Sequence, residues 1–182
     1  MPTIVFLGGE GVGKTSLISR YIKDHFPKEH DPTIEDSHEI KIKYDENENE
    51  VEFKILDTGG EEQIQNMLEQ WISHGNGFIL VFSVNDSKSL NALKKIVELI
   101  NNVDKDKLPK VLVGNKTDLE REVSPEKGEE FARNIKAKYF EISSMNDSTQ
   151  NINDIFNYCA KKILNKNSAK YEEYIPCRCI II

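Results

Sequence analysis

The eight residues GGEGVGKT, Gly8 to Thr15, decide the fold of this 182-residue chain. They match the pattern G-x-x-x-x-G-K-[ST], follow an apolar run at Thr3–Leu7 and precede a helical segment at Ser16–Asp24. In such a strand–loop–helix unit, backbone N–H groups of the loop turn inward at the positive end of the helix and cradle phosphates. The alternative is a glycine-rich turn without a ligand, which the common register of strand, lysine, threonine and helix argues against.

The polar residues of this loop have separate expected tasks. Lys14 is expected to reach the outer phosphates as a point charge, and Thr15 to offer its hydroxyl to Mg²⁺. Glu10 is the unusual member, because it places a carboxylate within a site for an anion. The loop residues predicted to contact a nucleotide are Glu10, Gly11, Val12, Gly13, Lys14, Thr15 and Ser16.

Beyond the loop, short apolar runs alternate with segments of helical periodicity, which is typical of a mostly parallel sheet with helices on both faces. Apolar positions recur at helical spacing over 90–100 and 152–163, and Ser124-Pro125 predicts a helix start. Alternating residues at Ile40–Tyr44 and Val51–Ile55 predict a hairpin with one wet face. Four strands that are nearly continuous in apolar residues are predicted at Thr3–Leu7, Gly77–Val84, Lys110–Asn115 and Tyr139–Ser143.

The predicted fold class is therefore α/β: one P-loop domain with a mostly parallel six-stranded sheet, one antiparallel edge strand and helices on both faces. We expect this domain to span residues 1–165. Residues 166–182 turn polar and are expected to form a flexible tail. The net charge of −7 argues against nucleic acid as a partner, and the three cysteines favour a reducing compartment over a disulfide framework.

The identity of the base is predicted from VLVGNKTD, whose last four residues include Asn115, Lys116 and Asp118. The carboxylate of Asp118 can accept hydrogen bonds from both N1–H and the 2-amino group of guanine. Adenine offers neither donor there, and leaving a buried acid unpaired costs about 1–3 kcal/mol or more. The alternative is an inconsequential surface turn, but this segment closes a strand, where α/β sheets bind ligands. The sequence thus predicts guanine over adenine.

Two further segments complete a family pattern. DPTIEDS at Asp31–Ser37 is similar to the effector segment of the Ras and Rap branch, and DTGG at Asp57–Gly60 resembles that family's DTAG. With the phosphate loop and NKTD, in this order over residues 3–165, the chain resembles a Ras-like small GTPase. The resemblance implies a monomeric switch, a P-loop GTPase domain that binds GTP or GDP with Mg²⁺. It also implies hydrolysis of GTP by in-line attack of water, chemistry of which Ras is the standard example.

The resemblance assigns roles to individual residues. Thr15, Thr33 and Asp57 are implied to hold Mg²⁺, and Gly60 to touch the γ-phosphate through its N–H. Loss of these contacts after hydrolysis would release two segments of the chain. Phe26 is implied to pack on the guanine ring, with a place in the core at a helix end as the alternative. Other residues implied to contact the nucleotide are His30, Thr33, Gly60, Asn115, Lys116, Asp118, Ser143, Ser144 and Met145, and the implied catalytic residues are Glu61, Gly60 and Lys14.

The effector segment leads into the exposed hairpin strand. An effector protein can add its own strand to such an open edge, and an acidic rim attracts a basic partner. The alternative is a solvated charged edge that only prevents aggregation. The resemblance further implies a guanine nucleotide exchange factor and a GTPase-activating protein as partners. The implied effector residues are Asp31, Pro32, Ile34, Glu35, Asp36 and Ser37.

Four departures from the family pattern concern predicted site residues. Glu10 replaces a glycine, Glu61 replaces the glutamine that orients the attacking water, His30 replaces a tyrosine and Met145 replaces a lysine. Glu10 is implied to point toward the γ-phosphate across roughly 6 Å, which costs about 3 kcal/mol at an effective dielectric near 20, so binding should survive.

Hydrolysis is the step that these departures affect. Glu10 can block or capture the arginine of an activating protein, an arginine worth 10³–10⁵ in rate. Glu61 can accept a proton from water but cannot donate one as an amide does. We expect slow hydrolysis and a poor response to activating proteins. One alternative is a hydrolysis-deficient, constitutively GTP-bound binding module; another is a small nucleotide kinase, which lacks support because no arginine-rich lid is visible.

The last four residues, Cys179-Ile180-Ile181-Ile182, fit the prenylation pattern C-a-a-X, with a chance terminal cysteine as the alternative. Cys177 can supply the second lipid that stable anchoring requires. We therefore expect a protein anchored through lipid to the cytoplasmic face of a membrane, the plasma membrane first among them.

Overall fold

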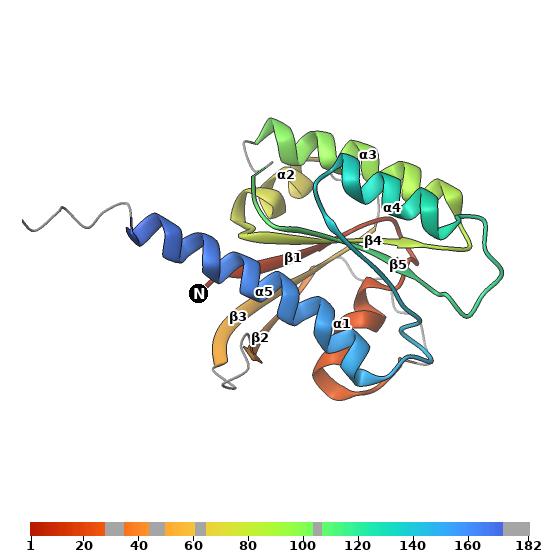
Figure 1. Cartoon of the computed structure of the whole chain (residues 1–182), viewed down its shortest axis with the longest axis horizontal. Helices are drawn as coiled ribbons and strands as arrows, with labels where there is room; N and C mark the ends of the chain where they lie inside the picture. The colour runs from red at the N-terminus through yellow and green to blue at the C-terminus, as the bar shows by residue number, and fades with distance from the viewer. Residues whose placement is uncertain (28–34, 44–49, 61–64, 104–106, 173–182) are drawn as a thin grey trace, which may run out of the picture.

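The computed structural model describes residues 1–27, 35–43, 50–60, 65–103 and 107–172. These residues form an α/β domain in which one six-stranded sheet, in the order β2-β3-β1-β4-β5-β6, lies between two sets of helices (Figure 1). The strands are β1 (Thr3–Leu7), β2 (Glu35–Lys43), β3 (Glu50–Thr58), β4 (Gly77–Ser83), β5 (Lys110–Asn115) and β6 (Lys138–Glu141). Only the β2–β3 pair is antiparallel, so the predicted fold class is confirmed.

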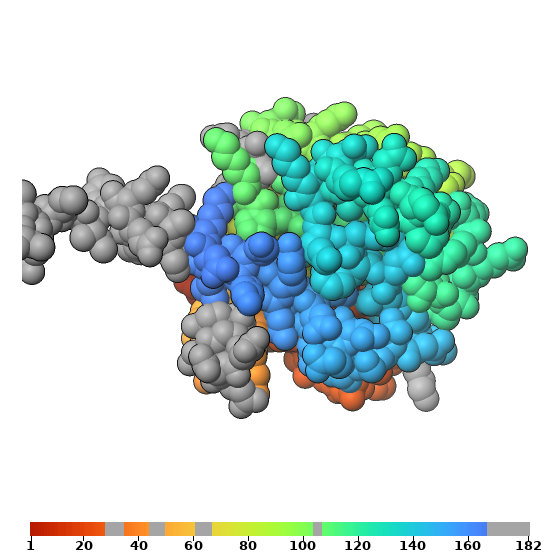
Figure 2. All heavy atoms as spheres, viewed as in Figure 1, coloured from red at the N-terminus to blue at the C-terminus, as the bar shows by residue number. Residues whose placement is uncertain are grey.

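Each face of the sheet has its own apolar cluster. One cluster lies under α1 and α5 and includes Phe6, Ile155 and Phe156; the other lies under α2, α3 and α4 and includes Leu80 and Trp71. The helices are α1 (Lys14–Lys23), α2 (Gln65–His74), α3 (Ser87–Asn102), α4 (Pro125–Asn134) and α5 (Thr149–Glu172). In the space-filling view, α5 (blue) lies on the near side below the cyan and green segments, and part of α1 (orange-red) is visible below it (Figure 2).

The sheet order reverses at β1. The chain leaves β1 toward β3 and β2 on one side and later returns to β4 on its other side. In open α/β sheets, ligands bind beyond the carboxyl ends of the strands at such a switch point. The loop Gly8–Gly13 begins at the carboxyl end of β1. The segments that follow β3, β4 and β5 begin at the same edge of the sheet. The fold therefore places the phosphate loop at the position where a ligand is expected.

The hairpin has the predicted wet face. Its inner residues Ile42, Phe53 and Ile55 are fully buried, because they face the cluster under α1 and α5. On the other face, opposite charges lie directly across the two strands, as in the pairs Glu39–Lys54 and Lys41–Glu52. Such cross-strand pairs favour one register, since a slip of one residue would bury the charges.

Capping residues set the starts of two helices. The carboxylate of Asp86 accepts a hydrogen bond from the N–H of Lys88 at 2.9 Å and caps α3. Ser124 accepts from the N–H of Lys127 and is followed by proline at the first helical position of α4. The predicted start of this helix is confirmed, and proline is suited to it because the first N–H of a helix has no partner.

Three elements differ from the sequence-based expectation. Strand β6 is an exposed to half-buried edge strand at Lys138–Glu141 instead of a buried strand, because it has β5 as a neighbour on one side only. Helix α2 was not predicted, although Trp71 and Ile72 are buried at helical spacing from other apolar residues. Helix α5 continues to Glu172, so residues 166–172 of the expected tail are helical. Extending a formed helix costs little compared with starting one.

No helix among these described residues has the length and apolar character needed to cross a membrane.

Candidate nucleotide-binding site

The phosphate loop enters α1 through Gly13. This residue caps the helix with φ +98°, a left-handed conformation in which a side chain would be strained. A Cβ at Gly13 would also lie 2.2 Å from Nδ2 of Asn115, so glycine is required for both backbone and contact reasons. The N–H groups of the first turn of α1 therefore face the end of the sheet, where they can bind an anion.

Lys14 is buried at the floor of this loop. Its side chain is 5% exposed, and its ammonium donates to the carbonyl oxygens of Gly8 at 2.9 Å and Gly9 at 2.8 Å. Burial lowers the pKa of Lys14 to about 8, although the negative charges of Asp57 and Glu10 raise it in part. The exposed acid in the loop thus supports the charged form of the lysine beside it.

Thr15 and Asp57 meet next to Lys14. The hydroxyl of Thr15 donates to Oδ2 of Asp57 at 2.7 Å, while Oδ1 of Asp57 is buried and has no hydrogen-bond partner among the residues that the structure describes. Burial raises the pKa of Asp57, although the hydrogen bond from Thr15 and the charge of Lys14 counteract this. A buried carboxylate oxygen without a partner is costly, and a cation would relieve that cost.

This pair suits Mg²⁺. Magnesium in phosphate sites takes one or two protein oxygens and completes its shell with phosphate and water. Thr15 and Asp57 offer such oxygens, and within the described part of the chain no cluster of three or more His, Cys, Asp or Glu side chains offers a full protein cage. The residues present therefore fit a magnesium ion that is held jointly with a nucleotide.

Gly60 packs directly on the phosphate loop. A Cβ at Gly60 would lie 2.1 Å from the backbone N and 2.2 Å from Cα of Glu10. The segment that follows β3 is therefore in contact with the loop at Glu10, one of the residues that depart from the family pattern. Any side chain at position 60 would separate the two segments.

Asn115 joins three segments of the site. It is fully buried at the end of β5, where its Nδ2 donates to the carbonyl of Val12 at 2.9 Å. Its Oδ1 accepts from the N–H groups of Lys116 at 2.8 Å and Ser144 at 3.0 Å. One amide side chain thus connects the phosphate loop, the segment after β5 and the segment after β6.

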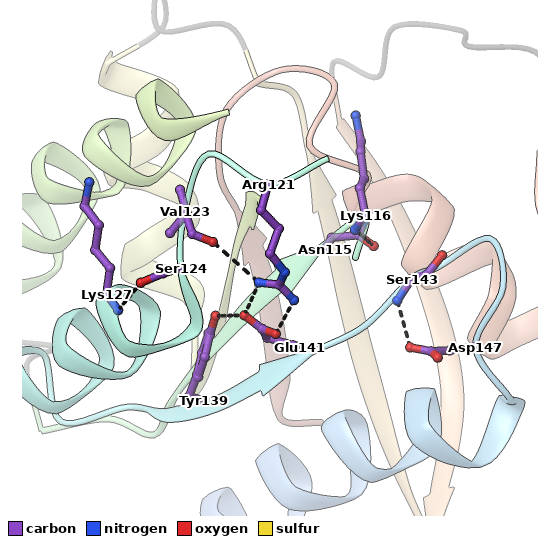
Figure 3. Close-up of polar contacts among 10 residues, drawn as sticks. All are labelled: Asn115, Lys116, Arg121, Val123, Ser124, Lys127, Tyr139, Glu141, Ser143 and Asp147. Atoms are coloured by element: carbon purple, nitrogen blue, oxygen red, sulfur yellow. Dashed lines mark hydrogen bonds and ion pairs between the residues drawn. The ribbon is translucent and has the colours of Figure 1, made fainter. Parts of the chain in front are cut away.

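The predicted base-reading residues lie around this junction. The hydroxyl of Ser143 donates to Oδ1 of Asp118 at 2.5 Å, and the N–H of Ser143 donates to Asp147 at 2.7 Å. Lys116 adopts a left-handed conformation with φ +65°, and its side chain extends away from Glu141 (Figure 3). Asp118 was predicted to be a buried acid. It is exposed instead, because it lies in the turn beyond the end of β5.

Ser144, Met145 and Phe26, which are also predicted to contact the base, differ in their surroundings. The N–H of Ser144, which the resemblance assigns to the base, donates here to Asn115, so a base would share that donor. Met145 is 57% exposed at the same rim. Phe26 is half-buried beyond the end of α1 and belongs to neither of the two apolar clusters that the structure describes.

The remaining predicted residues are divided between β2 and undescribed parts of the chain. Glu35, Asp36 and Ser37 are exposed at the start of β2, the edge strand. The residues outside the described part of the structure are His30, Asp31, Pro32, Thr33, Ile34, Glu61, Cys177 and Cys179.

Sequence reasoning missed two polar links at this edge of the sheet. Arg121 forms an ion pair with Glu141, which also accepts from the hydroxyl of Tyr139 (Figure 3). The indole of Trp71 in α2 donates to the carboxylate of Glu35 at 2.6 Å. The only sequence signals were a charged run after Asp118 and an isolated tryptophan, and neither specifies a partner.

Strand order, phosphate loop and the convergence of Lys14, Thr15, Asp57 and Asn115 define a P-loop GTPase fold with a site for a nucleotide at the switch point. Comparison with known proteins leads to the same class. The family model described as "Ras family" matches residues 3–165, and the chain belongs to this family.

Curated relatives agree with this placement. The chain is 37% identical over 166 residues to GTP-binding protein Rit1 of Mus musculus, covering 90% of this chain and 74% of the relative. It is 36% identical over 172 residues to Ras-like protein RAS2 of Hydra vulgaris, covering 93% and 88%. It is 40% identical over 169 residues to GTP-binding protein Rit2 of Mus musculus, covering 91% and 76%. As a member of the Ras family, whose members are GTPases, the protein is a GTP-binding switch.

Proposed function

We propose that the protein binds GDP or GTP with Mg²⁺ between the phosphate loop and the segments after β5 and β6, and that it hydrolyses GTP slowly. The observation that supports this most directly is the Thr15–Asp57 pair beside Lys14, in which one buried carboxylate oxygen has no partner within the described part of the chain. The ammonium of Lys14 would stabilise the outer phosphates, and the first N–H groups of α1 would surround them.

The roles of the metal and the base follow from the same geometry. Thr15 and Asp57 would hold Mg²⁺, which when bound neutralises charge on the phosphate oxygens. Asp118 would receive the N1–H and 2-amino groups of guanine, since its carboxylate lies at the rim and Ser143 already orients it. Binding of GDP, but not ADP, in competition against a fluorescent GDP analogue tests this assignment. Equal affinity for the two would contradict it.

Hydrolysis transfers the terminal phosphoryl group to water. The water oxygen bonds to the γ-phosphorus, the bond from that phosphorus to the bridging oxygen breaks, and GDP and inorganic phosphate result. Glu10 lies on the surface of the loop against Gly60, where an activating arginine would approach. Its carboxylate would repel developing negative charge and pair with that arginine, so both intrinsic and activated rates should be low.

Single-turnover hydrolysis tests this proposal. We expect the wild-type protein to respond weakly to a Ras-type activating protein, and the double variant Glu10→Gly, Glu61→Gln to respond strongly. A matched control is Glu39→Gln, which removes an acid from the exposed face of β2. Strong acceleration of the wild-type protein would contradict the proposed effect of the two acids.

A second candidate function is a binding module that holds GTP and hydrolyses it negligibly. Glu10 on the loop surface favours this candidate, because it hinders the reaction more than binding. The nucleotide content of protein purified from its own cells separates the two: mainly GTP supports the binding module, and mainly GDP supports the slow GTPase.

We also propose that effector proteins add a strand to β2. The support is that β2 is an edge strand with β3 as its neighbour and starts with the exposed acids Glu35 and Asp36. Binding of an effector should slow hydrogen exchange of β2 amides in the GTP form more than in the GDP form. Unchanged exchange in β2 on binding would place the partner elsewhere.

A lipid anchor at Cys179, with Cys177 as a second site, is a further proposal that rests on the C-a-a-X pattern and on no described residue. It would place the protein at the cytoplasmic face of a membrane. Mass spectrometry of protein from its own cells tests it, and an unmodified Cys179 would contradict it.

A further inference from the structure

A chain of hydrogen bonds lies immediately behind the base-reading residues. The guanidinium of Arg121 donates twice to Glu141, at 2.9 and 2.6 Å, and also to the carbonyl of Val123 at 3.4 Å. The hydroxyl of Tyr139 donates to Glu141 at 2.6 Å from the other side (Figure 3). None of these groups belongs to the predicted nucleotide contacts.

The surroundings of this chain keep its geometry defined. A Cβ at Gly128 of α4 would lie 2.2 Å from the hydroxyl of Tyr139, so Gly128 leaves the space which that hydroxyl occupies. Burial alone would raise the pKa of Glu141, but hydrogen bonds from Arg121 and Tyr139 lower it below its usual value. Burial and the bond to Glu141 raise the pKa of Tyr139, so its hydroxyl remains a donor.

This chain joins the two segments that carry the base contacts. Arg121 follows Asp118 by three positions, and Glu141 precedes Ser143 by two, so the ion pair spans the same two segments as the Ser143–Asp118 hydrogen bond. The N–H of Thr117 donates to the carbonyl of the residue after Glu141 at 3.2 Å. The distance between the segments is thus fixed on both sides of Asp118.

We propose that Arg121 and Glu141, supported by Tyr139, are positioning residues that hold the Asp118 carboxylate at the distance required to select guanine. The proposal rests on the proposed base-reading role of Asp118. Most surface ion pairs contribute little, but this one is bidentate, has a third donor and is partly buried, with side chains 32% and 21% exposed. A displacement of the segment by a fraction of an ångström weakens directional hydrogen bonds to the base.

Inosine diphosphate isolates the effect. Inosine retains N1–H but lacks the 2-amino group of guanine, so the ratio of GDP to inosine diphosphate affinity reports one hydrogen bond to Asp118. We expect the wild-type ratio to fall roughly three- to tenfold in Glu141→Gln and Arg121→Gln, because the bond to a charged acceptor loses its alignment. The double variant should fall no further than either single variant, since the two side chains act as one unit.

Controls separate positioning from stability. Glu130→Gln changes an exposed acid of α4 and should leave the ratio unchanged. Tyr139→Phe keeps the ring and removes one donor, so it should lower the ratio less than Glu141→Gln; it also provides a milder variant if Glu141→Gln folds poorly. Competition against a fluorescent GDP analogue gives the affinities, and the melting temperature of each variant is measured in parallel.

The outcomes are distinct. A lower ratio in the Arg121 and Glu141 variants, with ADP still excluded, supports the proposal. An unchanged ratio with a lower melting temperature overturns it, because the ion pair is then only structural. Wild-type protein that binds GDP, inosine diphosphate and ADP alike overturns the role of Asp118 itself, and the positioning role with it.

Discussion

The ammonium of Lys14 illustrates how single residues of the site balance opposing effects. Burial lowers its pKa to about 8, while the nearby carboxylates of Asp57 and Glu10 favour the charged form. A bound phosphate adds negative charge and raises this pKa again. Lys14 is therefore the residue whose protonation should be coupled most strongly to nucleotide binding.

The affinity for GDP should consequently depend on pH. Below about pH 8 the ammonium is already charged in the free protein; above it, binding requires proton uptake, so affinity should fall as pH rises, by up to about tenfold per unit. Titration calorimetry at pH 7, 8 and 9 in buffers of different ionisation enthalpy measures both affinity and proton uptake. A flat affinity without proton uptake would contradict the assigned position of Lys14.

Gly13 and Gly11 form a matched pair of glycines for testing the loop. Both have left-handed backbones, with φ +98° and +67°, but a Cβ at Gly13 would meet Asn115 at 2.2 Å, whereas one at Gly11 would meet no atom of the described residues within 4 Å. Gly11→Ala should lose about 1–2 kcal/mol of stability from backbone strain. Gly13→Ala should lose more and should release GDP faster, because it displaces the Asn115 side chain that joins three segments. Equal losses in urea denaturation would show that the contact is unimportant.

At the scale of elements, a hydrogen bond joins α2 to β2, and the sequence of neither element indicates it. Trp71 of α2 is 7% exposed and packs in the cluster with Leu56, while its indole N–H donates to Glu35 at the edge of the sheet. Glu35 pairs in register with Thr58, next to Asp57. One polar contact thus joins α2 to the start of β2, which is paired with the end of β3.

The single tryptophan of the chain makes this contact measurable. Glu35→Ala should shift the indole N–H resonance of Trp71 and lower stability by about 0.5–1.5 kcal/mol, as expected for loss of one hydrogen bond. Glu39→Ala changes an acid on the same strand and face and should leave the resonance in place. If both variants shifted the indole resonance equally, the shift would reflect the loss of a negative charge on β2 and not the loss of the hydrogen bond.

Elements were predicted well where their pattern is local. The strands β1, β4 and β5 are continuous apolar runs, and the hairpin alternates with period two, so their spacing alone identified them. Strand β6 was misjudged as buried because Tyr139 and Phe140 are aromatic, and burial at a sheet edge depends on strand order. Helix α2 was missed because its short apolar pattern lies within a polar stretch.

At the scale of the whole molecule, the core residues that the structure describes in α5 lie in the earlier part of this helix. The buried residues of α5 are Ile152, Ile155, Phe156, Cys159, Ala160 and Ile163. The last described side-chain contact of α5 is the bond from Lys166 to the carbonyl of Lys107 at 2.7 Å. The backbone beyond it continues as a helix to Glu172.

A chain that ends after Lys166 should therefore keep its stability. We expect the melting temperature of the GDP-bound form to change by less than about 2 °C, because every buried apolar side chain that the structure describes is retained. Membrane association in cells should be lost in the same variant, as the proposed lipid sites are removed. A fall in melting temperature above about 5 °C would show that residues 167–182 contribute to the packing of the domain.

The amino-acid sequence by itself determined the phosphate loop, the choice of strands and the hairpin, because each depends on residue type at a short, fixed spacing. Spacing also predicted Lys14 and Asp118 as site residues, whereas the role of Asp57 was implied by the family resemblance. The tertiary structure decided which side chains meet. Asn115 reaches Val12 across 103 positions, and Arg121 reaches Glu141 across 20, since the sheet order places the ends of β1, β5 and β6 at one edge. Contacts of this kind arise from strand order, and strand order follows from how both apolar faces of the sheet are covered by helices.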